Sequence, residues 1–489
     1  MSGKEGALGM NKPIYVGLAT GKALRLIIGI ILLVSGGGAF NASGQTLTTL
    51  HIFAGGDGSA PGGILAQGTN GNIYGITTAG GAHPNWGTVF EVSPSGTFTS
   101  LWSFTGGVDG GAPEGGIIRG TDGNLYGTTQ SGGGDPNCPG CGTVFRIISS
   151  NVFTNLHSFG SLDGAAWPSA PLAQGSDGYL YGTTWKGGNT NLNGGTGLGV
   201  VFRMSTDGSS TNLHVFNGND GFDPNGPLVQ STDGNFYGTT EYGGYLNLNF
   251  GLGDGTVFRI SPTGDFTNLY LFTGDASDGG VPISGLTRCV DGNFYGTTTS
   301  GGTGNQGTVF RITPSGTLTT LWSFCSQPSC TDGMLPNGLT QGSDGNFYGT
   351  TRNGSLFRIT PDGNLTNLYP VGGPFFQRGL FMQGADGCFY GVTYESTTTN
   401  GTVSRICIPL SPPANQVSEI QLSGGNVLLS VPSVAYETYQ LQFSSSMDPT
   451  NWVNVPGVSV TNSIGALLTL TNFGGAVGPQ GFYRFDITP

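Results

Sequence analysis

Short runs of apolar and β-branched residues follow one another along most of the chain, and glycine, aspartate and asparagine separate them. Between residues 283 and 324 four such runs stand in order, at 283–288, 293–298, 307–313 and 317–324, and we name them segments A, B, C and D. Runs of this length, rich in Thr, Val, Phe and Tyr and bounded by turn residues, are typical of β-strands. Outside the N-terminal region no segment keeps a helical period over 11 residues. The pattern therefore predicts an all-β protein.

The group of four segments occurs seven times. The phrase DGNLYGTT at 122–129 returns with small changes in every unit, and its tyrosines mark the period: Tyr74, Tyr126, Tyr181, Tyr237, Tyr295, Tyr348 and Tyr390. Seven units of four antiparallel strands favour a β-propeller, with a solenoid as the alternative.

Ring closure separates these two architectures. The seventh unit lacks segment D, but residues 46–53 (TLTTLHIF) match segment D at 317–324 (TLTTLWSF). An N-terminal strand that completes the last unit closes a ring and removes two sheet edges, whereas a solenoid has no use for it. We therefore expect a seven-bladed β-propeller over residues 45–410, closed by its N-terminal strand.

Different patterns flank the repeats. Basic residues, a nine-residue apolar run at 26–34 and small residues before position 45 predict a signal peptide over 1–44, and a short retained membrane anchor is the alternative. After its removal we expect no membrane span. Residues 411–415 (SPPAN) are typical of a linker. About six short alternating runs within 416–489 predict a small C-terminal β-sandwich.

Three phrases carry a family resemblance: DGN-aromatic-YGTT, GTVFRI and LTxLxxF, which recur across residues 45–407. With them the chain resembles the GloVer-type tandem repeat proteins, which are exported bacterial chains with propeller-like repeats and varied C-terminal modules. The resemblance implies export and a repeat architecture, and it implies no activity. The chain departs from the pattern at Asn70, Glu91, Cys388 and Ser404.

The charge balance narrows the range of partners. Only 9% of the residues are charged, and the formal net charge is −12. Lys186 is the only lysine after residue 44. Nucleic acids need clustered basic residues, so we expect no nucleic-acid partner, while neutral ligands remain open.

Seven cysteines are present. Cys138 and Cys141 form a CxxC pair in a Gly/Pro-rich loop, and Cys325 and Cys330 bracket an insertion after a D segment. We expect both pairs to be disulfides of an exported protein rather than redox or zinc sites. A two-residue turn at 353–354 in the sixth unit, carried over to the seventh, would place Cys407 opposite Phe389. A bridge between Cys388 and Cys407 is therefore not expected, and Cys289 has no evident partner.

Several charged residues repeat with the units, which favours a structural role. Asp-Gly pairs between segments A and B cap turns, and they do not provide the closely spaced oxygen ligands of a calcium loop, so no cofactor is expected and calcium stays open without support. Six arginines share one position in segment C and fit contacts with turn carbonyls or a repeat aspartate, with an anion-binding ring as the alternative: Arg146, Arg203, Arg259, Arg311, Arg358 and Arg405.

No catalytic motif is evident. Three of the four histidines occupy one position of segment D, where Trp or Tyr also occurs, so we interpret it as a packing position. A polysaccharide hydrolase or lyase would need converging carboxylates. The acids found in one unit each are the candidates: Glu91, Glu114, Asp223, Glu241 and Glu395.

Variation is concentrated at one end of the blades. The A–B and C–D turns are short and nearly constant, whereas the D–A and B–C loops vary, and in an up-and-down blade these loops emerge on one face. Their aromatic and polar residues suit a sugar ring or a protein interface, or they pack their own loops. The candidate ligand-binding residues are Trp86, Trp167, Trp185, Lys186, Phe222, Glu241, Tyr242 and Tyr245.

We therefore expect an exported, non-enzymatic propeller that binds a glycan or a protein at the cell exterior. A secreted polysaccharide hydrolase or lyase and a purely structural surface or adhesion protein are the alternatives.

Overall fold

The protein consists of two compact units in a computed structural model. The larger unit comprises residues 44–342 and 346–408, and the smaller comprises 1–43, 343–345 and 409–489. The structure describes residues 16–17, 46–138, 140–148, 152–160, 164–246, 252–289, 291–369, 381–393, 400–408, 419–423, 426–432, 438–444, 453–461, 467–472 and 482–488. The predicted signal peptide and the linker at 411–415 lie almost entirely outside these residues.

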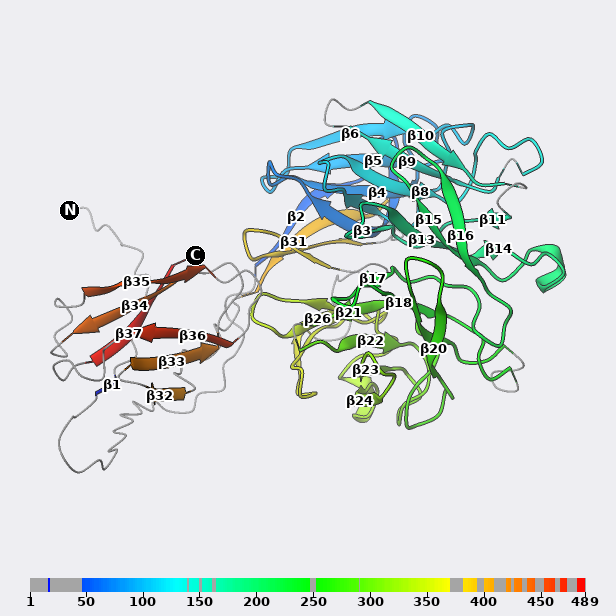
Figure 1. The fold of residues 1–489 in the computed structure, drawn as a ribbon. Helices are drawn as coiled ribbons and strands as arrows, with labels where there is room; N and C mark the ends of the chain where they lie inside the picture. Colours follow the sequence, from blue (N-terminus) through cyan, green and yellow to red (C-terminus); the bar gives the residue numbers. More distant parts are fainter. Residues whose placement is uncertain are drawn as a thin grey trace. The chain divides into compact units, whose positions relative to one another are not determined.

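The larger unit contains seven four-stranded antiparallel sheets, the blades of a β-propeller, as predicted (Figure 1). Blade one consists of β3 (Ser59–Gln67), β4 (Ile73–Ala79), β5 (Thr88–Val92) and β6 (Phe98–Ser103). Blade two consists of β7 (Ile117–Arg119), β8 (Leu125–Thr129), β9 (Thr143–Ile147) and β10 (Phe153–Ser158). Blade three consists of β12 (Ala173–Gln174), β13 (Leu180–Thr184), β15 (Val200–Met204) and β16 (Ser210–Val215).

Blade four consists of β17 (Val229–Gln230), β18 (Phe236–Thr240), β19 (Thr256–Ile260) and β20 (Phe266–Leu271). Blade five consists of β21 (Leu286–Arg288), β22 (Phe294–Thr298), β23 (Thr308–Ile312) and β24 (Leu318–Ser323). Blade six consists of β25 (Thr340–Gln341), β26 (Phe347–Thr350), β27 (Leu356–Ile359) and β28 (Leu365–Tyr369). Blade seven is β29 (Met382–Gln383), β30 (Phe389–Thr393), β31 (Thr402–Cys407) and β2 (Thr46–Ile52). The small sheet of β11 (Ala165–Ala166) and β14 (Lys186–Gly187) and the 3-10 turns η1 (Asn193–Gly195) and η3 (Pro328–Cys330) lie in loops.

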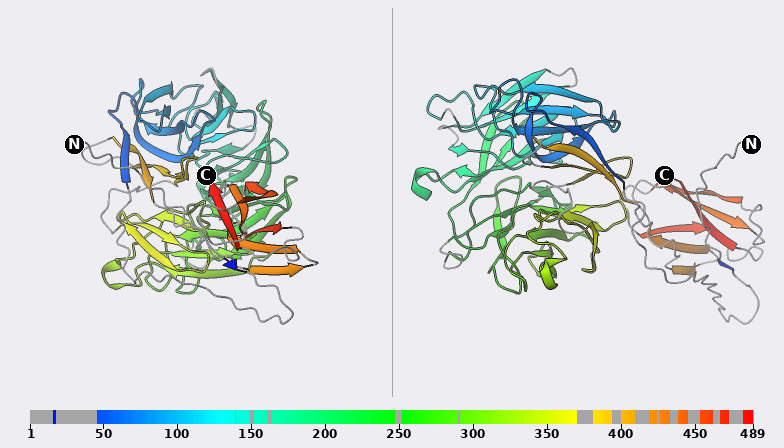
Figure 2. Two further views of the ribbon diagram at one scale, coloured as in Figure 1. Left: turned by 90° about the vertical axis from the view of Figure 1, so that its left-hand side faces the viewer. Right: turned by 180° about the vertical axis from the view of Figure 1, so that it is seen from behind.

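The N-terminal strand closes the ring, as the sequence predicted. β2 pairs with β31 as the outermost strand of blade seven, and the two lie side by side in Figures 1 and 2. A second bond joins blade seven to blade one, because the backbone N–H of Ala385 donates to Oε1 of Gln67 at 2.8 Å. Both ends of the repeat region are therefore tied into the same blade junction.

The core lies between neighbouring blades. The first strands of successive blades contact each other, as β3 and β7 do, so these strands form the inner wall of the ring. Farther out, aromatic rings stack across each junction. Tyr181 stacks on Phe236 at 3.9 Å and Tyr237 on Phe294 at 4.2 Å between ring centroids, and all four are buried. Burying one such side chain stabilises the fold by about 1.5–3 kcal/mol. A blade therefore depends on its neighbours on both faces.

We call the end of the blades that carries the A–B and C–D turns the turn face. The hydroxyl of the phrase tyrosine donates there to the aspartate of the A–B turn, as from Tyr126 to Asp122 Oδ2 at 2.7 Å, and Asn124 also donates to this carboxylate. The same tyrosine–aspartate bond occurs in four further blades, at Tyr181, Tyr237, Tyr295 and Tyr390. The repeat aspartates cap turns, as expected.

Two of the repeat arginines show the contacts that we expected of them. Nη1 of Arg203 donates to the carbonyl of Pro262 in the next blade at 3.1 Å, and Arg405 pairs with Asp386 at 3.7 Å. These contacts support the structural interpretation of the arginine positions.

The shared position of strand D is a packing position that also carries a polar partner. Nε2 of His51 lies 2.8 Å from Asp57, and the ring stacks on Phe98 of the next blade at 3.7 Å. Trp102 occupies the same position in blade one and donates to Asp109. The histidines therefore occupy packing positions, as predicted, and sequence reasoning missed the aspartate partners of His51 and His214.

The cysteines form three disulfides. Cys138–Cys141 and Cys325–Cys330 are paired, as expected, and Cys289 is free and buried. Cys388 and Cys407 also form a bridge, which corrects the sequence-based register. The β26–β27 loop contains three residues, 352–354, rather than two, because Phe347 pairs with Ile359. The register therefore shifts by one residue, and in blade seven Phe389 pairs with Ile406, which places Cys388 opposite Cys407.

The smaller unit contains two antiparallel sheets, in accordance with the predicted β-sandwich. One has the order β1 (Val16–Gly17), β37 (Phe482–Thr488), β34 (Thr438–Ser444) and β35 (Val453–Thr461), and the other β32 (Glu419–Ser423), β33 (Asn426–Pro432) and β36 (Leu467–Asn472). No helix in the described part of the chain has the length and apolar character needed to cross a membrane.

Candidate ligand-binding face

We call the end of the blades that carries the D–A and B–C loops the loop face. On this face, backbone hydrogen bonds join one residue of a D–A loop to one residue in each of two neighbouring B–C loops. The arrangement recurs in several blades, and we call it the loop frame. In blade three, Trp185 N donates to Trp167 O at 3.0 Å, and Trp167 N donates to Cys141 O at 2.9 Å. In blade four, Glu241 N donates in the same way to Asp223 O at 3.1 Å. The side chains at these positions differ between blades, although the backbone that carries them is the same.

The central position of this frame has an unusual backbone conformation. Six non-glycine residues directly before a proline have φ between 48° and 59°: Ala60, Ala112, Trp167, Asp223, Val281 and Leu335. This left-handed region is strained for a residue with a side chain, and the strain persists only where the surroundings enforce it. The backbone hydrogen bonds that the N–H and the carbonyl of this residue make hold it in that conformation. The loop frame therefore presents a different side chain in each blade at one rigid position.

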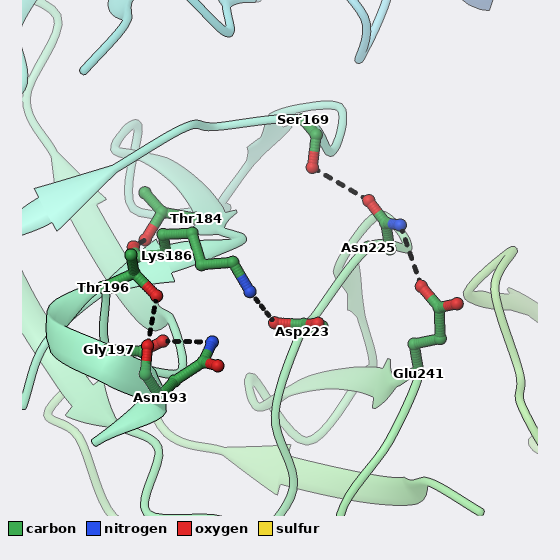
Figure 3. A network of polar contacts seen from close by, with 9 residues as sticks. All are labelled: Ser169, Thr184, Lys186, Asn193, Thr196, Gly197, Asp223, Asn225 and Glu241. Carbon is green, nitrogen blue, oxygen red and sulfur yellow. Dashed lines mark hydrogen bonds and ion pairs between the residues drawn. The ribbon is translucent and has the colours of Figure 1, made fainter. Parts of the chain in front are cut away.

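An ion pair lies at this frame between blades three and four (Figure 3). Nζ of Lys186 is 3.0 Å from Oδ1 of Asp223, and the two side chains are only 13% and 8% exposed. Nζ also lies 4.5 Å from the centroid of the Trp185 ring. Burial raises the pKa of Asp223, and Lys186 and the Trp185 indole oppose that rise. Among the described residues, no hydrogen bond reaches Oδ2 of Asp223.

A second polar chain runs beside the ion pair (Figure 3). Ser169 donates its hydroxyl to Asn225 Oδ1 at 2.8 Å, and Asn225 Nδ2 donates to Glu241 Oε2 at 3.2 Å. Burial raises the pKa of Glu241 and Asp223 adds to the rise, whereas Tyr242, Asn225 and Arg352 of blade six oppose it. The two polar chains therefore combine residues of blades three and four.

Aromatic rings flank both polar chains. The Trp167 and Trp185 rings lie 5.9 Å apart, and Phe222 stacks on Tyr242 at 5.4 Å between centroids. Burial, followed by the charge of Glu241, raises the pKa of Tyr242 to about 12, so its hydroxyl stays protonated at neutral pH. Tyr245 lies farther along the same loop and is 45% exposed.

The structure thus brings together six of the eight residues that the sequence proposed. Trp86 instead packs against Gly106 and Gly111 of a neighbouring loop, which is the packing alternative. Sequence reasoning missed Ser169 and Asn225. Each directly follows the proline of its D–A loop, and this fixed position was the signal that could have identified them.

Of the five candidate acids of a polysaccharide-cleaving enzyme, four lie in the described part of the chain. Asp223 and Glu241 lie in the site, and Glu114 accepts a hydrogen bond from Gln130 at 3.2 Å in blade two. Glu91 lies on the turn face, and Glu395 lies outside the described residues. Within the described ranges no three metal-ligating acids, histidines or cysteines form a group that could hold an ion.

The role of Glu91 explains why blade one departs from the repeat. There the turn aspartate is replaced by Asn70 and the strand C arginine by Glu91, so the carboxylate has moved from the turn to the strand. Oε1 of Glu91 accepts hydrogen bonds from Asn72 at 2.6 Å, Tyr74 at 2.8 Å and Asn70 at 3.0 Å. Although burial raises the pKa of Glu91, these bonds lower it overall. Glu91 is therefore a structural carboxylate.

The repeat region matches a known family. Residues 35–196 and 188–354 match the family model of the Gloeobacter/Verrucomicrobia repeat. No protein of curated function matches the sequence.

Several solved structures match the chain at low identity. The extracellular domain of a one-component system of B. thetaiotaomicron has 14% identity and a TM-score of 0.48, over 90% of this chain and 56% of that one. PorZ, a surface component of the type-IX secretion system of Porphyromonas gingivalis, has 12% identity and a TM-score of 0.44, over 86% and 57%. A gluconolactonase of Xanthomonas campestris has 14% identity and a TM-score of 0.37, over 75% and 91%. The chain thus spans little more than half of the first of these proteins, and the similarities carry no argument about function.

Proposed function

The chain belongs to the Gloeobacter/Verrucomicrobia repeat family, and we propose that it is a non-enzymatic binding propeller of the cell exterior that takes a neutral glycan on its loop face. The observation that carries the proposal is the cluster at blades three and four. It joins an aromatic pair to the Lys186–Asp223 ion pair and to the Asn225–Glu241 hydrogen bond. Three disulfides in one chain support an oxidising location.

The chemistry of the cluster favours a neutral sugar. Lys186 pairs with Asp223, and the charge of Arg352 acts to lower the pKa of Glu241, so a charged ligand would meet little net opposite charge. Sugar hydroxyls can donate to carboxylate oxygens that lack protein donors, such as Oδ2 of Asp223. The apolar face of a sugar ring packs against aromatic side chains, which also offer a polar edge.

Glycan binding can be measured on an array with the purified full chain. We expect specific binding that Trp185→Ala combined with Tyr242→Ala weakens by about tenfold or more, because each truncation removes on the order of 1 kcal/mol of contact. Tyr179→Ala is the matched control, since Tyr179 is 38% exposed on the turn face of the same blade three. Thermal unfolding of each variant separates lost contact from lost folding.

Two results would count against this proposal. Unchanged binding by the folded double variant would remove the ligand from this site. No binding to any glycan would favour a protein partner or a purely structural surface role.

A hydrolase or lyase is the second candidate, and one observation favours it. The pKa values of Asp223 and Glu241 are both raised, and perturbed carboxylates in one site are typical of general acids. This function requires turnover of a polysaccharide that Glu241→Gln abolishes while binding persists. Absence of product from a broad polysaccharide panel would rule against it.

A further inference from the structure

A buried carboxylate occupies an apolar position at the junction of blades four and five. Asp254 precedes the glycine that opens strand C, where no other described blade has an acid: this position is Trp86, Cys141 and Leu198 in blades one to three, Gln306 in blade five and Asn400 in blade seven. It is only 7% exposed. Its carboxylate lies over Gly274, because a Cβ added to that glycine would come within 2.6 Å of Cγ and Oδ1. The glycine therefore leaves space that the carboxylate fills.

The carboxylate lacks a partner in the part of the chain that the structure describes, where no hydrogen bond and no ion pair reaches the side chain of Asp254. Burial, followed by the like charge of Asp278, raises the pKa of Asp254. Asp278 already accepts hydrogen bonds from Tyr270 and Thr273. A buried, charged carboxylate without a partner is strongly unfavourable, so Asp254 either takes up a proton or binds a group from solution.

A second polar group without a partner faces the same space. The hydroxyl oxygen of Ser300 is buried and has no hydrogen-bond partner among the described residues. The Cβ position of Gly280 lies 2.9 Å from both Asp254 Oδ1 and Ser300 Oγ. The two oxygens therefore lie on the same side of Gly280, yet they do not hydrogen-bond to each other. A group bound between Asp254 Oδ1 and Ser300 Oγ would give both oxygens a partner.

We propose that Asp254 and Ser300 bind a hard cation, with Ca²⁺ as the ion that fits best, between the B–C loop of blade four and the D–A loop of blade five. Carboxylate and hydroxyl oxygens are the ligands that such ions take, and Ca²⁺ accepts waters in a flexible shell. The small exposure of Asp254 leaves solvent access for those waters. The bound ion offsets the repulsion between Asp254 and Asp278 and joins two loops of the loop face. This site does not depend on the proposed glycan ligand.

Metal binding is tested on the full chain with Ca²⁺ by calorimetry and with Tb³⁺ by luminescence, which the nearby Tyr270 can sensitise. We expect saturable binding, and a melting temperature that rises with Ca²⁺ concentration. Asp254→Leu should abolish both effects. The structure supports this substitution, because Leu198 occupies the equivalent position in blade three. Asp265→Asn, which removes an exposed turn carboxylate of the same blade, should leave both effects unchanged.

Other results would overturn the proposal. If neither ion binds and Asp254→Leu is more stable than the unchanged chain with or without Ca²⁺, Asp254 carries a proton or contacts water instead. If the leucine variant does not fold, Ser300→Ala and Asp254→Asn provide the same comparison, and unchanged ion binding in both contradicts the site. Glycan binding that persists in EDTA would leave this site intact, so the two proposals fail separately.

Discussion

Single residues on the turn face hold blades two, three, four, five and seven by a tyrosine–aspartate hydrogen bond. In blade four the Tyr237 hydroxyl donates to Asp233 at 2.8 Å, and the ring of Tyr237 is fully buried. The hydroxyl is the polar end of an otherwise apolar side chain that fills the junction with blade five. Because the same bond occurs in several blades, a substitution in one blade tests how much this bond contributes to stability throughout the repeat.

Tyr237→Phe should lower the free energy of unfolding at pH 7 by about 1 kcal/mol, because it removes one hydrogen bond to a charged but exposed acceptor and leaves the ring in place. Denaturant unfolding measures the change. Tyr179→Phe is the control, since the Tyr179 hydroxyl has no hydrogen-bond partner in the described part of the structure. Equal losses in both variants would contradict the assigned bond.

The same bonds predict how stability changes in acid. Although burial raises the pKa of Asp122, Asp233 and Asp291, hydrogen bonds from Tyr and Asn outweigh it and lower these values overall. An aspartate whose pKa is lower in the folded than in the unfolded protein stabilises the fold at pH values above its unfolded-state pKa of about 3.9. This contribution to stability is lost as the pH falls through the folded-state pKa. The difference between Tyr237→Phe and the unchanged chain should therefore shrink below about pH 4. A difference that stays constant from pH 7 to 3 would show that the bond does not depend on the carboxylate charge.

At the scale of elements, the β30–β31 hairpin shows what one residue of loop length changes. Cys388 and Cys407 were not expected to pair because a two-residue turn was assumed in blade six. The three-residue loop moves every partner by one position and brings the cysteines opposite each other. Loop residues such as Asn353 and Gly354 are compatible with either turn, so the repeat phrase alone did not determine the register.

The three bridges predict the thiol content. Under denaturing, non-reducing conditions the full chain should contain one thiol, because six of its seven cysteines are paired and Cys289 is free. Titration with a thiol reagent measures this number. Cys289→Ser should reduce it to zero. Three thiols would show that Cys388 and Cys407 are unpaired.

At the scale of the whole molecule, the ring depends on β2. Leu50 on this strand is 9% exposed and packs in one cluster with Phe53, Phe90 and Val403. The closing strand therefore contributes hydrophobic core as well as backbone hydrogen bonds.

Leu50→Ala should lower the free energy of unfolding by about 2–3 kcal/mol, as expected for a large-to-small change in a core. Thr49→Ala is the matched control, because Thr49 is exposed on the same strand. Unfolding followed by tryptophan fluorescence compares the two. If Leu50→Ala has no larger effect than Thr49→Ala, β2 is not an integral part of blade seven.

The sequence predicted the fold far better than the site. Phrase repetition and the displaced D segment were enough for the seven-bladed ring, because repeated residues serve the same contacts in each blade. The site depends on residues that do not repeat. Glu91 looked like a candidate acid but replaces a structural aspartate, whereas Asn225 looked ordinary and lies in the cluster. Its fixed position after a proline marks the loop frame, but only tertiary contacts between blades decide which side chains at that position meet.

Ring closure also determines when β2 can pair during synthesis of the chain. The carbonyl of Phe53 accepts a hydrogen bond from Asn400, 347 residues later in the chain. Bringing such distant segments together costs only about 2 kcal/mol more loop entropy than joining two neighbouring units. During synthesis, however, the strand that emerges first waits until β31 has emerged. A chain that stops before residue 402 leaves β2 without its partner, and such an unpaired strand is a template for association with other chains.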